Sequence, residues 1–291
     1  MKLIDGKEIA KQIKNELKAE VAEIIDRGDR APHLAAVLVG EDGASQTYVA
    51  SKEKACREIG FTSSVYRFPE NTSEKELLNT IDFLNNDEEV DGYIVQLPLP
   101  AHINVNTVLQ RINPDKDVDG FHPQNIGKLM MGLPTFIPAT PFGIIQLIER
   151  YKIETEGKHC VVLGRSNIVG TPMALLMSRK GYPGNATVTL CHSKTHNLEE
   201  ICQSADILIA AIGQPGFVKA NMVKEGAVVI DVGIHRIPDD TKEKGYYITG
   251  DVDYDEVAKK ASFITPVPGG VGFMTIVALL MNTFKAYKKQ A

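Results

Sequence analysis

Apolar positions in the first half of the chain switch between the period of a helix and short runs of strand length. Apolar residues recur at helical spacing from Ile9 to Ile24, and Gly28 marks the stop of that segment. Strand-like and helix-like segments then follow in alternation: 33–39, 43–59, 64–68, 73–85 and 90–95. This alternation is typical of a parallel α/β sheet, which we expect in this half.

The second half shows the same alternation from Cys160 onward. Its expected strands cover 160–163, 187–190, 207–210, 228–231 and 263–264. We expect a helix over 172–179, with Thr171 as its N-cap and Pro172 at its first helical position. A further helix over 141–151 is a plausible connection between two domains.

The first strand of the second half leads into a glycine-containing loop and then into the expected helix. Between Gly164 and Gly170 the loop lacks the middle glycine of G-x-G-x-x-G and is one residue longer. A strand, a glycine turn and a capped helix form the first unit of a dinucleotide-binding fold, because the helix N-terminus favours a pyrophosphate. On these residues alone, a purely structural turn remains the alternative.

The residues after the next expected strand bear on the choice between NAD and NADP. An NAD site usually carries an acid there, which binds the ribose 2′-hydroxyl. The chain instead has Ser193, Lys194 and Thr195, and Arg165 lies in the first loop. Hydroxyl groups and cations suit a 2′-phosphate, so the hypothesis is an NADP site, with an ordinary solvated turn as the alternative.

Composition narrows the class of protein. The chain has 291 residues, of which 43% are hydrophobic and 24% charged, as in a globular protein with room for two domains. A net charge of −5 without a basic arm gives no reason to expect nucleic acid as a partner. No apolar run reaches the length of a membrane span, and the start lacks a signal-peptide pattern. We therefore expect no membrane partner and a cytoplasmic location.

Three polar features in the first half follow expected strands, where open α/β sheets bind ligands. The first is Tyr48-x-x-x-Lys52, whose spacing puts an aromatic ring and an amine on one helix face. A solvated helix face is the alternative. The second is Gln96, which begins a turn that contains Pro98 and Pro100. This turn presents the side-chain amide of Gln96 at a defined place, and a purely structural loop is the alternative.

The third feature is the acidic loop from Asp115 to Gly120. It imitates the start of a calcium loop, but the twelfth position is Ile126 rather than Glu, so a calcium site is not expected. An aspartate here suits the donor edge of a nitrogen heterocycle, and a solvated acidic loop is the alternative. His192 and His196 fall in a turn, and the four cysteines lack ligand spacing, so we expect no metal.

Taken together, these stretches resemble the bifunctional methylenetetrahydrofolate dehydrogenase/methenyltetrahydrofolate cyclohydrolase family. The matching stretches, in family order, are 44–55, 96–100, 115–122, 164–170, 231–234 and 265–272. One departure is Ala139, which stands where the family pattern has a cysteine. Any role for a thiol is absent at that position, although alanine should preserve the backbone path.

The resemblance implies two reactions in one cleft. A hydride passes from 5,10-methylenetetrahydrofolate to NADP⁺, and water then opens the methenyl product to 10-formyltetrahydrofolate. Lys52 looks like the group that transfers protons in the second step, since desolvation and a cationic substrate lower the pKa of a lysine. Gln96 is similar to the family amide that orients this lysine. Tyr48 looks like the ring that stacks on the folate, and Asp119 like the carboxylate that pairs with the pterin.

The remaining site residues also come from the resemblance. The implied further substrate contacts are Leu97, Pro98, Pro268, Gly269 and Gly270. The implied cofactor contacts are Gly164, Arg165, Ser166, Ser193, Thr195 and Ile234. Glycines 269, 270 and 272 would let the backbone approach a ligand closely.

The expected fold class is therefore α/β, with an N-terminal catalytic domain and a Rossmann-like dinucleotide-binding domain. By resemblance, the apolar helix over 273–288 returns to the first domain, so the expected domains are 1–138 with 273–291, and 139–272. Tetrahydrofolate one-carbon derivatives are the implied partners, and a homodimer is implied by the family. Two alternatives stay open: an NADP-dependent hydroxy-acid dehydrogenase using Lys52 and Asp119, and a nucleotide-sensing module without turnover.

Overall fold

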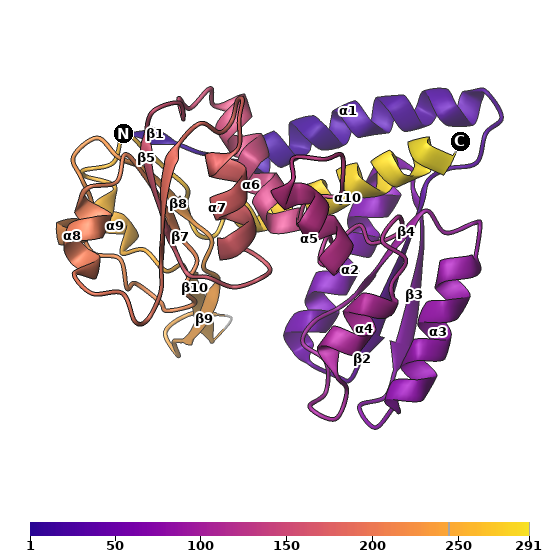
Figure 1. Ribbon diagram of the computed structural model, residues 1–291. Coiled ribbons are helices and arrows are strands. Elements are labelled where there is room, and N and C mark those ends of the chain that lie inside the picture. Colours follow the sequence, from indigo (N-terminus) through magenta and orange to yellow (C-terminus); the bar gives the residue numbers. More distant parts are fainter. Residues whose placement is uncertain (244, 291) are drawn as a thin grey trace. The chain divides into compact units, whose positions relative to one another are not determined.

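The helices and strands belong to two units, each with its own parallel sheet (Figure 1). The computed structural model describes residues 1–243 and 245–290. The small-sheet unit comprises Lys11–Ala139 and Ile276–Ala291, and the large-sheet unit comprises Met1–Ala10 and Thr140–Thr275. The unit boundaries fall within or beside the helices α1 (Gly6–Asp26), α6 (Ala139–Arg150) and α10 (Val271–Gln290).

The small-sheet unit is built on three parallel strands in the order β3-β2-β4. The strands are β2 (His33–Val39), β3 (Thr62–Phe68) and β4 (Gly92–Val95), and the crossover helices are α2 (Gly43–Ile59) and α3 (Glu74–Asn86). The chain leaves β2 for β3 on one side and returns to β4 on the other. Ligands in open α/β sheets bind at the carboxyl ends of the strands where the order reverses in this way, here between β2 and β4.

Apolar side chains from one face of this sheet pack against α3 and α4 (Val105–Arg111) to form a core. Its sheet side comes from alternate positions of β2 and β4, as the two-residue period of a strand requires. Helix α3 begins after Ser73, whose hydroxyl accepts a hydrogen bond from the Glu76 amide at 3.2 Å. Ser73 and Glu76 have the spacing of a capping box, and this bond is one of its two contacts.

The C-terminal part of α10 belongs to the small-sheet unit, as the resemblance implied. Its buried Asn282 donates two hydrogen bonds, to the carbonyls of Val118 at 2.8 Å and Ile137 at 2.9 Å. Lys285 donates to the carbonyl of Thr135 at 2.7 Å. This part of α10 is thus bonded both to the acidic loop and to the segment 135–137 that follows it.

The large-sheet unit has six parallel strands in the order β1-β11-β8-β7-β5-β6. They are β1 (Lys2–Leu3), β5 (His159–Leu163), β6 (Thr187–Cys191), β7 (Ile207–Ala210), β8 (Val228–Asp231) and β11 (Phe263–Ile264). The order reverses between β5 and β7, which is the dinucleotide-binding position of a Rossmann-like sheet. Helix α7 (Gly170–Ser178) follows β5, and α8 (Leu198–Gln203) follows β6.

Two expectations about local structure are wrong. Residues 1–10 were expected in the first domain, but β1 pairs with β11, so they belong to the large-sheet unit. Thr171 is not the N-cap of α7, because that helix already begins at Gly170. The hydroxyl of Ser166 instead accepts from the amides of Val169 at 3.2 Å and Gly170 at 3.4 Å, and these contacts start the helix earlier.

The short helices and strands are not predicted by the pattern of apolar positions along the sequence. They are α5 (Pro123–Met130), α9 (Tyr254–Val257), a 3₁₀ turn (Ala220–Met222) and the antiparallel hairpin β9 (His235–Pro238) and β10 (Tyr246–Thr249), besides β1, α4 and α8. Each spans too few residues for an apolar period to repeat, so tertiary contacts decide its conformation.

Candidate functional site

Lys52 lies on the buried face of α2, not on its solvated face. The buried positions of this helix are Ser45, Val49, Lys52, Ala55, Cys56 and Ile59, which form one stripe. Asp42 caps the helix, accepting from the Ser45 amide at 2.7 Å. Lys52 is only 7% exposed, and its Nζ donates to Oε1 of Gln96 at 3.1 Å. The solvated reading of the Tyr48-x-x-x-Lys52 face is therefore wrong for the lysine.

Gln96 is held from both sides, which fixes the orientation of its amide. Its backbone amide donates to the Val37 carbonyl at 2.9 Å, continuing the β2–β4 ladder by one residue. Its side-chain Nε2 donates to the Leu97 carbonyl at 2.6 Å, so Oε1 is the atom turned to the lysine. Leu97 and Pro98, which follow Gln96, are joined by a cis peptide bond.

Burial dominates the electrostatics around this lysine. It lowers the pKa of Lys52 below the ordinary lysine value, and the negative charge of Asp119 partly opposes that shift. Burial also raises the pKa of Asp119, and here the positive charge of Lys52 opposes the shift. The two groups are therefore electrostatically coupled, and each keeps the other closer to its charged form.

The loop that carries Asp119 is organised by a second aspartate, which sequence reasoning missed. The buried carboxylate of Asp117 accepts from the backbone amides of Gly120 at 3.1 Å and His122 at 2.8 Å, and from Nδ2 of Asn125 at 2.8 Å. The Asp119 carbonyl also accepts from the Ala139 amide at 3.2 Å. Alanine at position 139 thus preserves a backbone contact to the loop.

Gly120 is needed in this loop for two reasons. Its φ of +76° is a left-handed conformation, and an added Cβ would lie 2.7 Å from the backbone nitrogen of Pro138. An aspartate that bonds amides a few residues ahead, followed by a glycine, is a sequence signal of such a turn. That signal was present at Asp117 and Gly120 and points to a rigid acidic loop.

Tyr48 lies one helical turn before Lys52 and is half-buried. Burial raises the pKa of its hydroxyl group above the ordinary tyrosine value. The structure thus brings Tyr48, Lys52, Gln96 and Asp119 together at the reversal point of the small sheet. An aromatic surface, a desolvated amine, a fixed amide and a carboxylate can bind a planar heterocycle and move protons on it.

The glycine loop of the large-sheet unit is packed so tightly that side chains are excluded. Gly164 has φ +106°, and a Cβ there would lie 2.1 Å from the Ala211 carbonyl oxygen. A Cβ on Gly170 would lie 1.9 Å from the Gly164 carbonyl oxygen. The two glycines therefore let the loop close onto the start of α7, where the positive end of the helix dipole favours an anion.

The polar residues expected near a 2′-phosphate lie after neighbouring strands, and Lys194 is among them and is exposed. Arg165 and Ser166 follow β5 and are exposed, and Ser193 follows β6 and is exposed. Thr195 differs, because its hydroxyl accepts from the His192 amide at 2.9 Å and closes the turn. The expected residues are thus grouped, with Thr195 engaged in holding the loop.

The last expected contacts lie in the large-sheet unit. Ile234 follows β8 and is 46% exposed. The peptide bond between Val267 and Pro268 is cis, and the Gly269 carbonyl accepts from the Lys7 amide at 3.0 Å. A Cβ on Gly270 would lie 2.7 Å from the Pro266 carbonyl oxygen, so close packing within the protein already requires this glycine.

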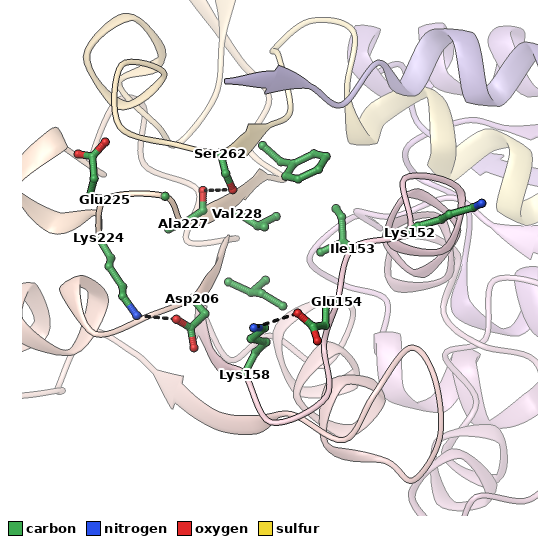
Figure 2. A pocket seen from close by; sticks show the side chains of 13 residues that line it. Lys152, Ile153, Glu154, Lys158, Asp206, Lys224, Glu225, Ala227, Val228 and Ser262 are labelled. Carbon is green, nitrogen blue, oxygen red and sulfur yellow. Dashed lines mark hydrogen bonds and ion pairs between the residues drawn. The ribbon is translucent and has the colours of Figure 1, made fainter.

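A cavity of about 340 Å³ opens at the other edge of the large sheet (Figure 2). Its lining includes Ile207 and Val228, the first residues of β7 and β8. Two pairs of its charged side chains bond to each other, Lys224 with Asp206 and Lys158 with Glu154 at 3.1 Å (Figure 2). It is lined by none of the candidate residues.

Within 1–243 and 245–290, no cluster of three or more His, Cys, Asp and Glu side chains is arranged to hold a metal ion. No helix in the same ranges is both long and apolar enough to cross a membrane.

Comparison with known proteins covers both units. A family model described as the catalytic domain of tetrahydrofolate dehydrogenase/cyclohydrolase matches residues 4–119, and one described as its NAD(P)-binding domain matches residues 138–291. A protein of Bacteroides thetaiotaomicron named bifunctional protein FolD is 62% identical over 289 residues, covering 99% of each chain. One of the same name from Flavobacterium psychrophilum is 60% identical, covering 100% of this chain and 99% of its own.

Solved structures agree with these matches. The bifunctional methylenetetrahydrofolate dehydrogenase/cyclohydrolase of Campylobacter jejuni is 49% identical, with a TM-score of 0.94 and complete coverage of both chains, 100% each. The corresponding Trypanosoma brucei enzyme, solved with NADP cofactor and an inhibitor, is 39% identical with a TM-score of 0.93, covering 99% of this chain and 97% of its own.

Proposed function

The chain belongs to the tetrahydrofolate dehydrogenase/cyclohydrolase family, and on that premise we propose how its two units divide the chemistry. The enzyme oxidises 5,10-methylenetetrahydrofolate with NADP⁺ and hydrolyses the methenyl product to 10-formyltetrahydrofolate. The small-sheet unit binds the folate and carries the proton transfers, and the large-sheet unit binds the dinucleotide. The observation that carries this division is the buried amine of Lys52, held by Gln96 and coupled to Asp119.

Lys52 is the proton-transferring group of the hydrolysis. Water must lose one proton when it adds to the methenyl carbon; when the ring opens, a ring nitrogen must gain a proton and the hydroxyl of the adduct must release one to solvent as the formyl C=O forms. A lysine with a lowered pKa has a neutral amine available to accept the first proton, and its ammonium form then donates the second. The Gln96 amide oxygen accepts from Nζ, so it keeps the amine aimed in one direction.

Tyr48 and Asp119 bind the pterin rather than react with it. The half-buried ring of Tyr48 provides a stacking surface, and Asp119 accepts hydrogen bonds from the pterin nitrogen donors. A ligand without those donors leaves the carboxylate desolvated and unpaired, which gives strong discrimination. Leu97 and Pro98, from the same turn as Gln96, line this site, and we assign Pro268, Gly269 and Gly270 to the substrate as well.

The large-sheet unit has the features that NADP requires. Gly164 and Gly170 let the loop pack closely against the start of α7, where the positive end of the helix dipole suits a pyrophosphate. Arg165, Ser166 and Ser193 supply a cation and two hydroxyls for the 2′-phosphate, and Thr195 closes their turn. The backbone of Ile234 binds the carboxamide. When bound, NADP⁺ accepts the hydride, and the protein's part is to hold it in place.

Two further assignments rest on the family and on the cysteines. We propose a homodimer, which size-exclusion chromatography with light scattering would test. We also propose a cytoplasmic location, because all four cysteines are free and buried within strands and helices or next to them. A disulfide found in the native protein would contradict that location.

The function is tested by incubating the purified chain with 5,10-methylenetetrahydrofolate and either NADP⁺ or NAD⁺. We expect absorbance from the reduced nicotinamide with NADP⁺, followed by 10-formyltetrahydrofolate in the products. Binding of NADPH without turnover would instead identify a nucleotide-sensing module. Turnover of a small hydroxy acid, with folate inert, would identify a different dehydrogenase.

A further inference from the structure

Two buried aspartates in the large-sheet unit play no part in the proposed chemistry. Asp231 ends β8 and is 3% exposed, and Asp251 lies just after β10 and is fully buried. Oδ1 of Asp231 accepts from the amides of Gly233 and Asp251, both at 2.9 Å, and its Oδ2 accepts from the Val252 amide at 2.9 Å. The carboxylate of Asp231 thus fixes the backbone that carries Asp251.

Asp251 in turn joins two other segments. Its Oδ2 accepts from the amides of Ile212 at 2.8 Å and Gly213 at 3.0 Å, in the loop that follows β7. Its Oδ1 lies 2.8 Å from Nε2 of His235, the first residue of β9. An ionised carboxylate only accepts hydrogen bonds, so Nε2 carries the hydrogen. One side chain therefore fastens the loop after β7 to the start of the hairpin.

Glycines make room for these carboxylates. A Cβ on Gly233 would lie 2.5 Å from Oδ1 of Asp251, and a Cβ on Gly250 would lie 1.9 Å from Oδ2 of Asp231. Burial raises the pKa of Asp231 to about 6, so its ionised form is costly even with three amide donors. Burying these two carboxylates is costly, and two glycines are needed to make room for them. We infer that the backbone segments that they bond must be held in a defined position.

The residue that the two aspartates hold in place is Ile234. The residue before it, Gly233, is bonded to Asp231, and the residue after it, His235, is bonded to Asp251. Ile234 makes the dinucleotide contact in the proposed function, and the loop after β7 lies at the reversal point beside β5. The two aspartates therefore hold both segments of the carboxyl edge that a nicotinamide would meet.

We propose that Asp251, supported by Asp231, is a positioning residue for hydride transfer, and that it acts on Ile234 through His235. This inference rests on the proposed function, since it assumes that Ile234 binds the dinucleotide. It concerns only the dehydrogenase reaction, because hydrolysis of the methenyl substrate needs no dinucleotide.

The test compares His235→Phe with His235→Gln. Phenylalanine keeps an aromatic ring but loses the donor, whereas glutamine retains an N–H that can reach a carboxylate. We expect His235→Phe to lower the dehydrogenase kcat/KM for NADP⁺ by about tenfold or more, as loss of a hydrogen bond to a charged group does. His235→Gln should recover most of that loss. Hydrolysis of methenyltetrahydrofolate, assayed without dinucleotide, should change less than about twofold in both variants.

Arg236→Ala is the matched control in the same hairpin. Arg236 lies over the Tyr246 ring at 5.2 Å and has no bond to Asp251, so its loss perturbs the hairpin without cutting the link. Both reactions should stay within about twofold of the unmodified enzyme. Equal losses of both reactions in His235→Phe, or unchanged dehydrogenase activity, would overturn the positioning role.

Two further measurements keep the inference separate from the proposed function. NADPH binding, followed by nicotinamide fluorescence, should weaken in His235→Phe whatever the second substrate is. Asp251→Asn should weaken it less than Asp251→Ala, because the amide oxygen can still accept from Ile212 and Gly213. If the unmodified chain binds NADPH but does not oxidise methylenetetrahydrofolate, the proposed function fails while these binding comparisons still decide the inference. Unchanged NADPH affinity in all of these variants would refute it.

Discussion

The two units place their candidate sites at equivalent positions but build them from different groups. Each site lies where the strand order reverses, between β2 and β4 in the small sheet and between β5 and β7 in the large one. In the small-sheet unit, buried side chains with shifted pKa values line the site. In the large-sheet unit, the corresponding loop has closely packed glycines, the start of a helix and exposed polar side chains.

The difference follows from what each site must do. Moving protons near neutral pH requires a titratable group whose pKa the protein has shifted, and burial is the means. Holding a dinucleotide requires close approach of the backbone to phosphates, and side chains would only obstruct it. Changes in the first region should therefore affect proton chemistry, and changes in the second should affect cofactor binding.

The largest effect is expected from Lys52→Met, which removes the amine but keeps an unbranched apolar side chain. Hydrolysis of methenyltetrahydrofolate should fall by about 10²–10⁴-fold, the usual contribution of a general acid–base group. Folate binding should remain measurable, because Tyr48 and Asp119 are unchanged. Near-normal hydrolysis by this variant would refute the role of Lys52.

Lys116→Met is the matched control for that experiment. Lys116 is also buried in the small-sheet unit with a pKa lowered by burial, but its Nζ donates to the carbonyls of Leu84 at 3.0 Å and Asp87 at the end of α3. Its loss should lower the free energy of unfolding by about 1–3 kcal/mol, since buried acceptors lose their donor. Hydrolysis per folded molecule should stay unchanged.

Gly164→Ala should separate the two reactions in the opposite direction. The new Cβ would meet the Ala211 carbonyl oxygen at 2.1 Å, so the loop must move. A displacement of about 1 Å costs about a hundredfold in rate, and we expect that loss for NADP⁺-dependent oxidation. Hydrolysis without dinucleotide should persist. Gly157→Ala, at φ +70° with open space around it, controls for backbone strain alone.

Arg165→Ala should have a smaller effect, confined to the 2′-phosphate. Loss of an exposed charge-assisted contact should lower the preference for NADP⁺ over NAD⁺ by about tenfold. The kcat/KM for NAD⁺ in the same variant is the internal control and should hold steady. A strong preference for NAD⁺ in the unmodified enzyme would contradict the proposal that this loop binds the 2′-phosphate of NADP.

The subtlest effect concerns pH. The charge of Asp119 raises the pKa of Lys52, so Asp119→Asn should lower that pKa further. If the neutral amine is the reactive form, hydrolysis rises with pH through the pKa of Lys52. The rising limb of the kcat/KM profile should therefore move to lower pH in Asp119→Asn, alongside weaker folate binding. A limb that moves to higher pH would contradict the coupling of the two groups.

Much of the fold could be predicted from the sequence, because strands β2, β7, β8 and β11 are apolar runs bounded by turn residues. The acidic loop and the glycine loop also carry local signals. The burial of Lys52 was available too, since positions 45, 49, 52, 56 and 59 form one helix face, although a lysine normally indicates solvent.

Other features depend on contacts between distant residues. β1 is only two residues long and exists through its pairing with β11. Asp251 accepts from the amides of Ile212 and Gly213, which lie 39 and 38 positions before it, so no local sequence pattern predicts its role. The N-cap of α7 was misassigned for a related reason, because Ser166 bonds the amides of Val169 and Gly170 and the helix already begins at Gly170.

The central claim is that burial makes Lys52 a proton-transferring group, and a titration of its side-chain nitrogen tests it directly. Lysine labelled with ¹⁵N would be followed by NMR across pH in the unliganded enzyme, with the Lys52→Met spectrum identifying the signal. The account predicts a pKa for Lys52 below the ordinary value of 10.5. A pKa at or above that value would contradict it.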